Sequence, residues 1–166
     1  MPVQFTTSYL TDSLNVLRQY KKMAEGAMEQ VSEEQLFHAI DDESNSIAII
    51  VKHMTGNMRS RWTDFLTTDG EKSDRNRDRE FEEPAQSRAE LMEVWNRGWQ
   101  LVFHAIEPLQ ESDLTRTVTI RDEPHSVMQA IQRQVAHYAC HIGQIMFLAK
   151  HFRGREWTSL SIPKKR

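Results

Sequence analysis

The sequence predicts an all-α protein built as a four-helix bundle. Apolar residues recur at spacings of three and four along four long segments, which is the period of an amphipathic helix. All five prolines lie outside these segments, where a residue without a backbone N–H is tolerated. Apolar residues are 39% of the chain and charged residues 27%, as in packed globular proteins. A length of 166 residues suits one hydrophobic core, so we expect a single domain over residues 1–166.

The first predicted helix covers residues 4–30 and has one apolar side. Charged side chains occupy its other sides, as expected for a helix that packs against a core. Ser32 and Gln35 then have the spacing of a capping box, which predicts a short helical connector over residues 33–39. The apolar side of the first helix consists of Leu10, Leu14, Leu17, Ala24, Met28 and Val31.

The second predicted helix covers residues 44–67. It follows the acidic cluster at residues 41–43, whose carboxylates suit a helix amino terminus. Residues 47–51 are apolar on nearly all sides, so this helix should be buried on several sides, and His53 follows directly. The next stretch, residues 69–83, is rich in charges and poor in large apolar side chains. It is predicted to be a mobile surface loop.

Pro84, and Ser87 spaced three residues before Glu90, mark the start of the third predicted helix. Pro108 ends it, because proline cannot continue a helix. Residues 115–120 alternate apolar and polar side chains and include β-branched ones, which favours a short strand. This strand is too short to form the core of a sheet protein.

The fourth predicted helix covers residues 127–152. A hairpin around residues 121–124 would lead into it, and Ser126 with Gln129 has capping-box spacing at its start. Gly154 is suited to end it. The apolar side of this helix consists of Ile131, Val135, Tyr138, Ile142, Ile145 and Leu148.

Charge and hydropathy exclude several kinds of partner. The net charge of −3 and the pI near 6.2 argue against nucleic acid, and the basic tail at residues 163–166 is too short to change this. The longest apolar stretch, residues 47–51, is far too short to cross a membrane. Residues 1–10 lack a secretory signal pattern, and the single Cys140 suits a reducing compartment, so we expect a cytoplasmic protein.

Three of the seven histidines form a candidate metal site. His137 and His141 are four residues apart, so a helix places both imidazoles on one face, turned by only ~40°. His53 lies near the middle of the other helix with an apolar interior, at a similar depth in a bundle. Three neutral imidazoles suit Zn²⁺ or Ni²⁺ and leave a position for water or substrate. The alternative is three core histidines that are hydrogen-bonded to polar neighbours.

The run AHYACHIGQI at residues 136–145, together with His53 in the second helix, resembles the DinB-like (DinB/YfiT) superfamily. The resemblance covers nearly the whole chain. It implies an up-down-down-up four-helix bundle with one divalent metal ion held by His53, His137 and His141. It also implies a homodimer, and some members of the superfamily are metal-dependent thiol S-transferases.

Two functional hypotheses arise from the site. In the first, the chain is a metal-dependent enzyme that transfers a thiol cofactor to a small electrophilic substrate or hydrolyses a small molecule. In the second, it is a non-catalytic dimerising helical protein whose histidines are structural. Asn57 and Gln144 are candidates to hydrogen-bond a ligand or substrate. Cys140 is rotated ~60° from His137 and ~100° from His141 around the helix, so it is an awkward fourth ligand. No residue stands out as a general base. The four tryptophans are predicted to lie in the core or in a dimer interface.

Overall fold

The structure is mostly helical, as predicted, with five α-helices and one small antiparallel sheet in the described residues. It is a computed structural model that describes residues 4–82 and 87–162. Pro84 and the basic tail at residues 163–166 therefore lie outside the described residues. The elements are α1 (Tyr9–Glu29), α2 (Glu33–Phe37), α3 (Ile47–Trp62), the 3₁₀ helix η1 (Asp78–Phe81), α4 (Arg88–Ile106), η2 (Glu111–Thr115), β1 (Thr117–Ile120), β2 (Glu123–Ser126), α5 (Val127–Arg153) and η3 (Gly154–Glu156).

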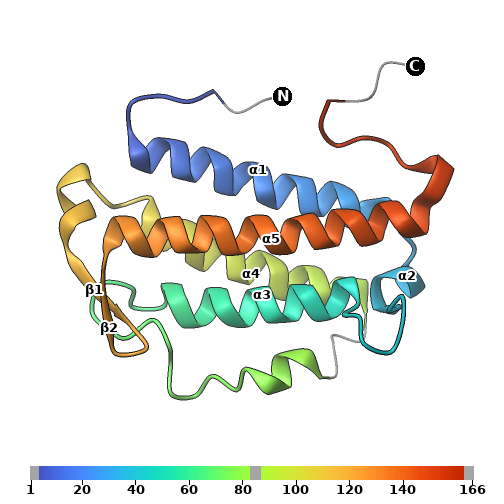
Figure 1. Cartoon of the computed structure of the whole chain (residues 1–166), viewed down its shortest axis with the longest axis horizontal. Coiled ribbons are helices and arrows are strands. Elements are labelled where there is room, and N and C mark those ends of the chain that lie inside the picture. Colours follow the sequence, from blue (N-terminus) through green and yellow to red (C-terminus); the bar gives the residue numbers. More distant parts are fainter. Residues whose placement is uncertain (1–3, 83–86, 163–166) are drawn as a thin grey trace.

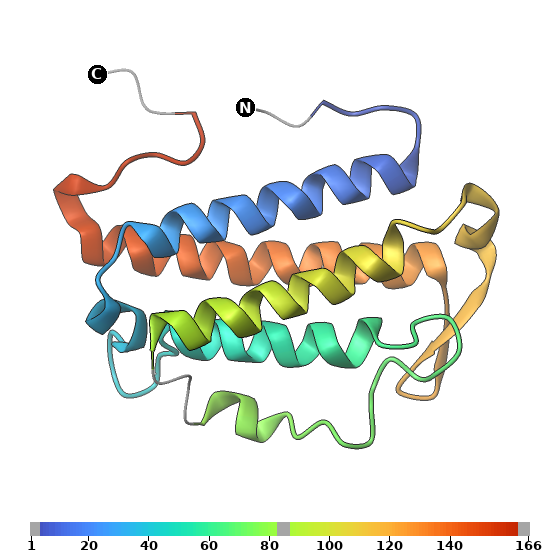
Figure 2. The same ribbon diagram turned by 180° about the vertical axis from the view of Figure 1, so that it is seen from behind.

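The four long helices lie side by side and share one core. α1 packs against α5, α3 packs against α4, and α3 also contacts α5. Followed along the chain, α1 and α5 run in one direction and α3 and α4 in the opposite one (Figures 1 and 2). The hairpin of β1 and β2 lies at one end of these helices and α2 at the other. The α3–α5 contact is the one that brings His53 to the predicted histidine pair.

Serine starts all five α-helices of the described structure. Each serine is extended, and its hydroxyl accepts a hydrogen bond from the backbone N–H three residues later. These bonds satisfy N–H groups that have no partner within the helix. The predicted capping boxes at the starts of α2 and α5 are both present. The five serines are Ser8, Ser32, Ser46, Ser87 and Ser126.

α1 and α3 are shorter than predicted. α1 begins at Tyr9 instead of residue 4, since Ser8 is its cap. α3 begins at Ile47, after the cap Ser46, and it ends at Trp62 instead of residue 67. The C-cap Thr63 is already extended, with a ψ of 125°, and Asp64 turns the chain away with a φ of 48°, which an α-helix does not permit. Apolar periodicity continues past both true ends, so it does not mark these boundaries.

Aromatic side chains fill the centre of the core. Trp95, Trp99 and Tyr138 are fully buried, and Trp62 donates a hydrogen bond of 2.8 Å from its indole Nε1 to the Tyr138 hydroxyl. Trp62, Trp95 and Trp99 are therefore core residues. The core was one of the two locations predicted for the tryptophans, and a dimer interface was the other. α3 and α4 approach closely at Gly98, where a Cβ would lie 2.9 Å from a methionine sulfur. Among the described helices, none combines the length and apolar character needed to cross a membrane.

The hairpin before α5 is tied to the segment that follows α3. Its turn residues, Arg121 and Asp122, have positive φ values of 56° and 61°, typical of a two-residue hairpin turn. The Asp69 carboxylate accepts hydrogen bonds of 2.9 Å from both of their backbone N–H groups and one of 2.6 Å from that of Glu71. This one carboxylate therefore joins the hairpin to residues 69–71.

Acid should weaken this connection. Burial raises the pKa of Asp69, but the three backbone hydrogen bonds outweigh it and hold the pKa below its ordinary value. Because the folded pKa is lower than the unfolded one, the carboxylate stabilises the fold above about pH 4, and this stabilisation is lost as the pH falls through the folded pKa. We expect the Tm of the wild-type chain, followed by circular dichroism, to drop more between about pH 5 and about pH 3 than that of Asp69→Asn. The exposed Asp42→Asn should behave like wild type, and equal acid sensitivity of Asp69→Asn would contradict the role of Asp69.

Candidate metal centre

His53, His137 and His141 lie together, facing one another from α3 and α5. His137 and His141 stand one turn apart on α5, and their Nε2 atoms are 3.1 Å apart. The ring centroid of His53 lies 5.5 Å from that of His137 and 4.9 Å from that of His141. One nitrogen from each of the three rings lies within 4.8 Å of the other two, so the group could hold a metal ion.

In His53 and His141, a hydrogen bond at the outer ring nitrogen determines which nitrogen of the ring keeps its lone pair. His53 Nδ1 lies 2.9 Å from Oε2 of Glu80, and His141 Nδ1 lies 2.8 Å from Oε1 of Gln144. These oxygens only accept hydrogen bonds, so each Nδ1 carries the proton and each Nε2 keeps its lone pair. Such outer hydrogen bonds orient histidine ligands in metalloproteins.

His137 and His141 are in the neutral form that binds metals. Burial, followed by the neighbouring imidazoles of His141 and His53, lowers the pKa of His137 to about 3. Burial also lowers the pKa of His141, although its hydrogen bond with Gln144 opposes the shift. His137 Nδ1 is buried and has no hydrogen-bond partner in the described structure. Among the described residues, the hydrogen-bond partner of His137 is therefore on its inner side alone, where its Nε2 lies 3.1 Å from Nε2 of His141.

The spacing of the His137 and His141 nitrogens fits a shared ion. Two ligands at about 2.0–2.1 Å from a tetrahedral ion stand about 3.3 Å apart, close to the 3.1 Å between His137 Nε2 and His141 Nε2. No carboxylate or thiol of the described residues joins the three histidines in this group. Cys140 is exposed and lines the larger cavity instead of joining this group.

Glu80 belongs to the site, although the helical periodicity of the sequence did not indicate it. It is only 6% exposed, and its two carboxylate oxygens accept hydrogen bonds of 2.7 and 2.8 Å from Nε and Nη2 of Arg75. Burial raises the pKa of Glu80, but the bonds from His53 and Arg75 outweigh it and lower that pKa. Glu80 is therefore an ionised carboxylate beneath His53.

The prediction that residues 69–83 form a surface loop is correct for most side chains of the described part, residues 69–82, because they are exposed. It is wrong for Arg75 and Glu80. Both side chains are buried, with exposed fractions of 3% and 8%. The segment ends in η1, where the ring of Phe81 stacks on His53 at a centroid distance of 4.8 Å. A high density of charges indicates solvent exposure only when the charges do not pair with one another.

Gly56 leaves the space that Glu80 occupies. It lies one turn after His53 on α3, and a Cβ there would lie within 3.0 Å of both Oε1 and Cδ of Glu80. Real Cβ atoms do not approach so closely, so any larger residue would displace the carboxylate. A glycine in the interior of a predicted helix, three residues after a candidate ligand, was the one sequence signal of this contact.

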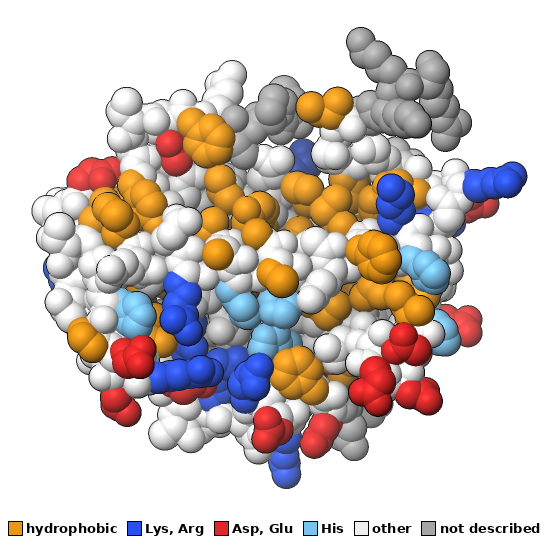
Figure 3. Space-filling view, viewed as in Figure 1, with side chains coloured by type: hydrophobic (Ala, Val, Ile, Leu, Met, Phe, Trp, Pro, Cys, Tyr) orange, Lys and Arg blue, Asp and Glu red, His pale blue; other side chains and the backbone are white. Residues whose placement is uncertain are grey.

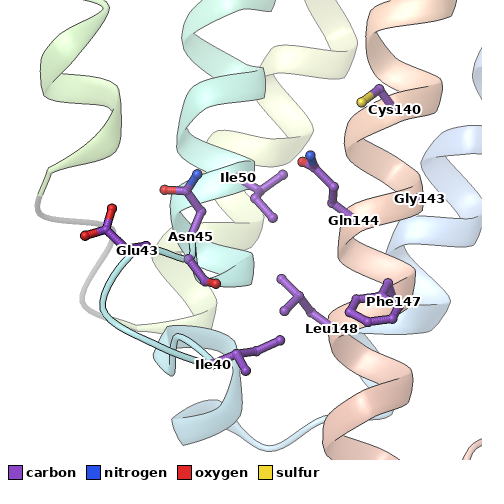
Figure 4. A pocket seen from close by; sticks show the side chains of 10 residues that line it. Ile40, Glu43, Asn45, Ile50, Cys140, Gly143, Gln144, Phe147 and Leu148 are labelled. Atoms are coloured by element: carbon purple, nitrogen blue, oxygen red, sulfur yellow. The ribbon is translucent and has the colours of Figure 1, made fainter.

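One cavity borders the histidines, and a larger one is joined to them through Gln144. The larger, of about 510 Å³, lies between the start of α3 and the carboxyl-terminal half of α5, and Gln144 connects it to His141 (Figure 4). Apolar side chains such as Ile50 and Leu148 line it together with polar groups of Ser44 and Asn45. The smaller, of about 150 Å³, borders His53 and His137 and is lined mainly by arginines. Figure 3 shows Lys and Arg side chains gathered directly beside histidine side chains on this face.

The remaining candidates lie at different distances from the centre. Asn57 lines the smaller cavity, and its Oδ1 accepts a hydrogen bond of 3.3 Å from Tyr138. It has no hydrogen bond to a histidine of the site in the described structure. Gln144 contacts His141 directly.

The Gly56→Ala variant tests the close contact with Glu80. Overpacking of this kind costs about 1–3 kcal/mol, so we expect the free energy of unfolding, measured with urea, to fall by about that amount. Gly143→Ala in α5 is the matched control, since a Cβ there meets nothing within 4 Å. That change should be neutral or stabilise by up to ~1 kcal/mol through helix propensity. Equal effects of the two substitutions would show that Glu80 does not depend on Gly56.

The comparison with protein families covers the whole site. Residues 4–166 match the family described as "Protein of unknown function (DUF1572)", and this range includes all three histidines, Glu80 and Gln144. A search of curated proteins finds no match. The chain belongs to the DUF1572 family.

Proposed function

We propose that this chain is a DinB-like metal protein and a metal-dependent enzyme that acts on a small molecule. The directions of the four long helices agree with an up-down-down-up bundle, and the histidines occupy the helices that the resemblance implies. His53, His137 and His141 would hold one divalent ion, with Zn²⁺ or Ni²⁺ suited to three neutral imidazoles. Its reaction would be a thiol S-transfer or a hydrolysis.

One observation carries the metal proposal. Three imidazoles converge from two helices, and the outer nitrogens of two of them are engaged by acceptors, so that the inner nitrogens keep their lone pairs. Without an ion, Nε2 of His137 can carry its proton and donate it to Nε2 of His141, 3.1 Å away. A cation would take the place of that proton and be bound by all three inner nitrogens.

The surroundings of the site favour an enzyme over a purely structural centre. Structural zinc sites are closed by four protein ligands, whereas catalytic sites keep an open position. Only three candidate ligands converge here among the described residues, one cavity borders His53 and His137, and a second cavity is lined by Gln144, which contacts His141. A substrate and a thiol cofactor would thus have separate room near the centre.

In the proposed transfer, a sulfur–carbon bond forms while the bond from that carbon to the leaving group breaks, and the leaving group departs with the electron pair. A divalent ion bound at the histidines would supply a nucleophile at neutral pH by lowering the pKa of a thiol or water. Glu80 keeps the proton on His53 Nδ1 and so orients the ring. Gln144 does the same for His141, and Phe81 covers one face of His53.

The second candidate is a non-catalytic, dimerising helical protein. Two large apolar side chains of α5, Met128 and Phe147, are 41% and 66% exposed. Apolar side chains also extend across the face formed by α1 and α5 (Figure 3). A homodimer through this face fits either candidate, so metal and activity measurements must decide between them.

Metal retention tests the proposal. We expect the wild-type chain, loaded with Zn²⁺ or Ni²⁺ and desalted, to retain about one ion per chain by elemental analysis, and His137→Ala to retain none, because two imidazoles hold an ion far less tightly. His151→Ala is the matched control, since His151 is an exposed histidine of the same helix. Wild-type chain without retained metal would overturn the proposal.

Metal removal should affect the two candidates differently. If the site is catalytic, chelation should leave the circular dichroism spectrum intact while abolishing thiol consumption in a mixture of low-molecular-weight thiols and an alkylating electrophile. If the site is structural, chelation should unfold the chain or lower its Tm strongly, since the metal then supplies folding free energy.

Glu80→Gln should weaken metal binding with the fold retained. The substitution preserves side-chain volume but removes the charge that raises the basicity of His53. Loss of such an outer partner typically costs about 10–100-fold in metal affinity, which competition with a chromogenic chelator would measure. Glu82→Gln, at an exposed carboxylate of the same segment, should bind metal like wild type. Unchanged affinity of Glu80→Gln would show that Glu80 only supports the packing of its segment.

A further inference from the structure

The smaller cavity beside the histidines is lined by five arginines from four separate parts of the chain. It has a volume of about 150 Å³, and His53 and His137 form part of its wall. The arginines come from α3, from residues 69–82, from the hairpin turn and from α5, so only the fold brings them together. They are Arg61, Arg75, Arg77, Arg121 and Arg133.

Carboxylates balance only part of this charge. Glu71 pairs with Arg61, Arg75 and Arg121 at N–O distances of 3.0, 3.2 and 2.9 Å. Glu80 pairs with Arg75 and is also bonded to His53. Five guanidinium groups therefore share two carboxylates, and positive charge remains in excess in a folded, partly enclosed place.

Two of the arginines have no ion pair with any carboxylate in the described part of the chain. Arg133 is exposed on α5, one turn before His137. Arg77 lies over the ring of Phe81, with its guanidinium carbon 5.6 Å from the ring centroid. Both guanidinium groups are thus available to a ligand at the mouth of the cavity.

Two residues of the cavity wall also carry buried polar atoms without partners. Arg61 and Gln134 are only 5% and 3% exposed, and Nε of Arg61 and Oε1 of Gln134 have no hydrogen-bond partner in the described structure. A buried donor without a partner costs about 1–3 kcal/mol. Because Nε of Arg61 is covered, a bound anion would reach it only after a shift of the guanidinium group.

We propose that this cavity binds the carboxylate or phosphate group of an anionic substrate and places the rest of that substrate at the histidines. Guanidinium groups match both oxyanions through paired hydrogen bonds. A cavity of about 150 Å³ has room for one such group. The inference deepens the proposed function, because it names the substrate class of the same site.

Anion binding to the full chain tests the inference. Inorganic phosphate and acetate are titrated separately at constant ionic strength by isothermal calorimetry, with chelator and with Zn²⁺. We expect saturable binding of at least one of them in both conditions, and a loss of at least about tenfold in the Arg77→Gln/Arg133→Gln variant with unchanged Tm. Arg97→Gln, which removes an exposed arginine of α4 that pairs with Glu93, should bind like wild type. The tighter of the two probes identifies phosphate or carboxylate as the group.

The outcomes separate this inference from the metal proposal. Absence of binding of both probes, or unchanged affinity in the double variant, overturns the inference while the metal analysis is unaffected. Binding that requires Zn²⁺ and persists in the double variant also overturns it, since the ion and not the arginines would then hold the anion. Binding with chelator present supports the arginine site even if the chain retains no metal.

Discussion

The hydrogen-bonded chain from His53 through Glu80 to Arg75 is the interaction on which the site depends. Glu80 accepts from both neighbours in a buried position, so it sets the tautomer of His53 and anchors residues 69–82 to α3. Without Glu80, the buried Arg75 would keep Glu71 as its carboxylate partner, and the fold would be destabilised. Gly56 belongs to the same arrangement, since only glycine leaves room for the carboxylate against the helix.

The same chain of contacts links the candidate metal centre to the arginine-lined cavity. Arg75 belongs to both, through its pair with Glu80 and its place in the cavity wall. Positive charge from Arg61 and Arg75 contributes to the low pKa of His137, which keeps that imidazole neutral. A divalent cation at the histidines would be repelled by these arginines unless anions intervene. Glu80 and Glu71 supply two carboxylates, and an anionic substrate would supply further negative charge.

Local patterns predicted the helical elements well and their ends less well. Capping boxes at Ser32 and Ser126 marked true helix starts, because a cap depends on residues only three apart. The predicted α3 was longer than the observed helix, because apolar residues continue beyond the turn at Asp64. Arg75 and Glu80 were taken for solvent-exposed charges, since a sequence does not reveal which charges pair at a distance.

By itself, the sequence determined that the chain is helical, where α2 and α5 begin after their capping boxes, and that His137 and His141 share a face of one helix. These properties follow from contacts within a few residues, which the helix repeat dictates. Only the tertiary structure decided that His53 lies within reach of that pair, that Glu80 orients it, and that five arginines from distant segments surround one cavity. Those distances depend on how α3, α5 and residues 69–82 pack, and packing is a property of the whole core.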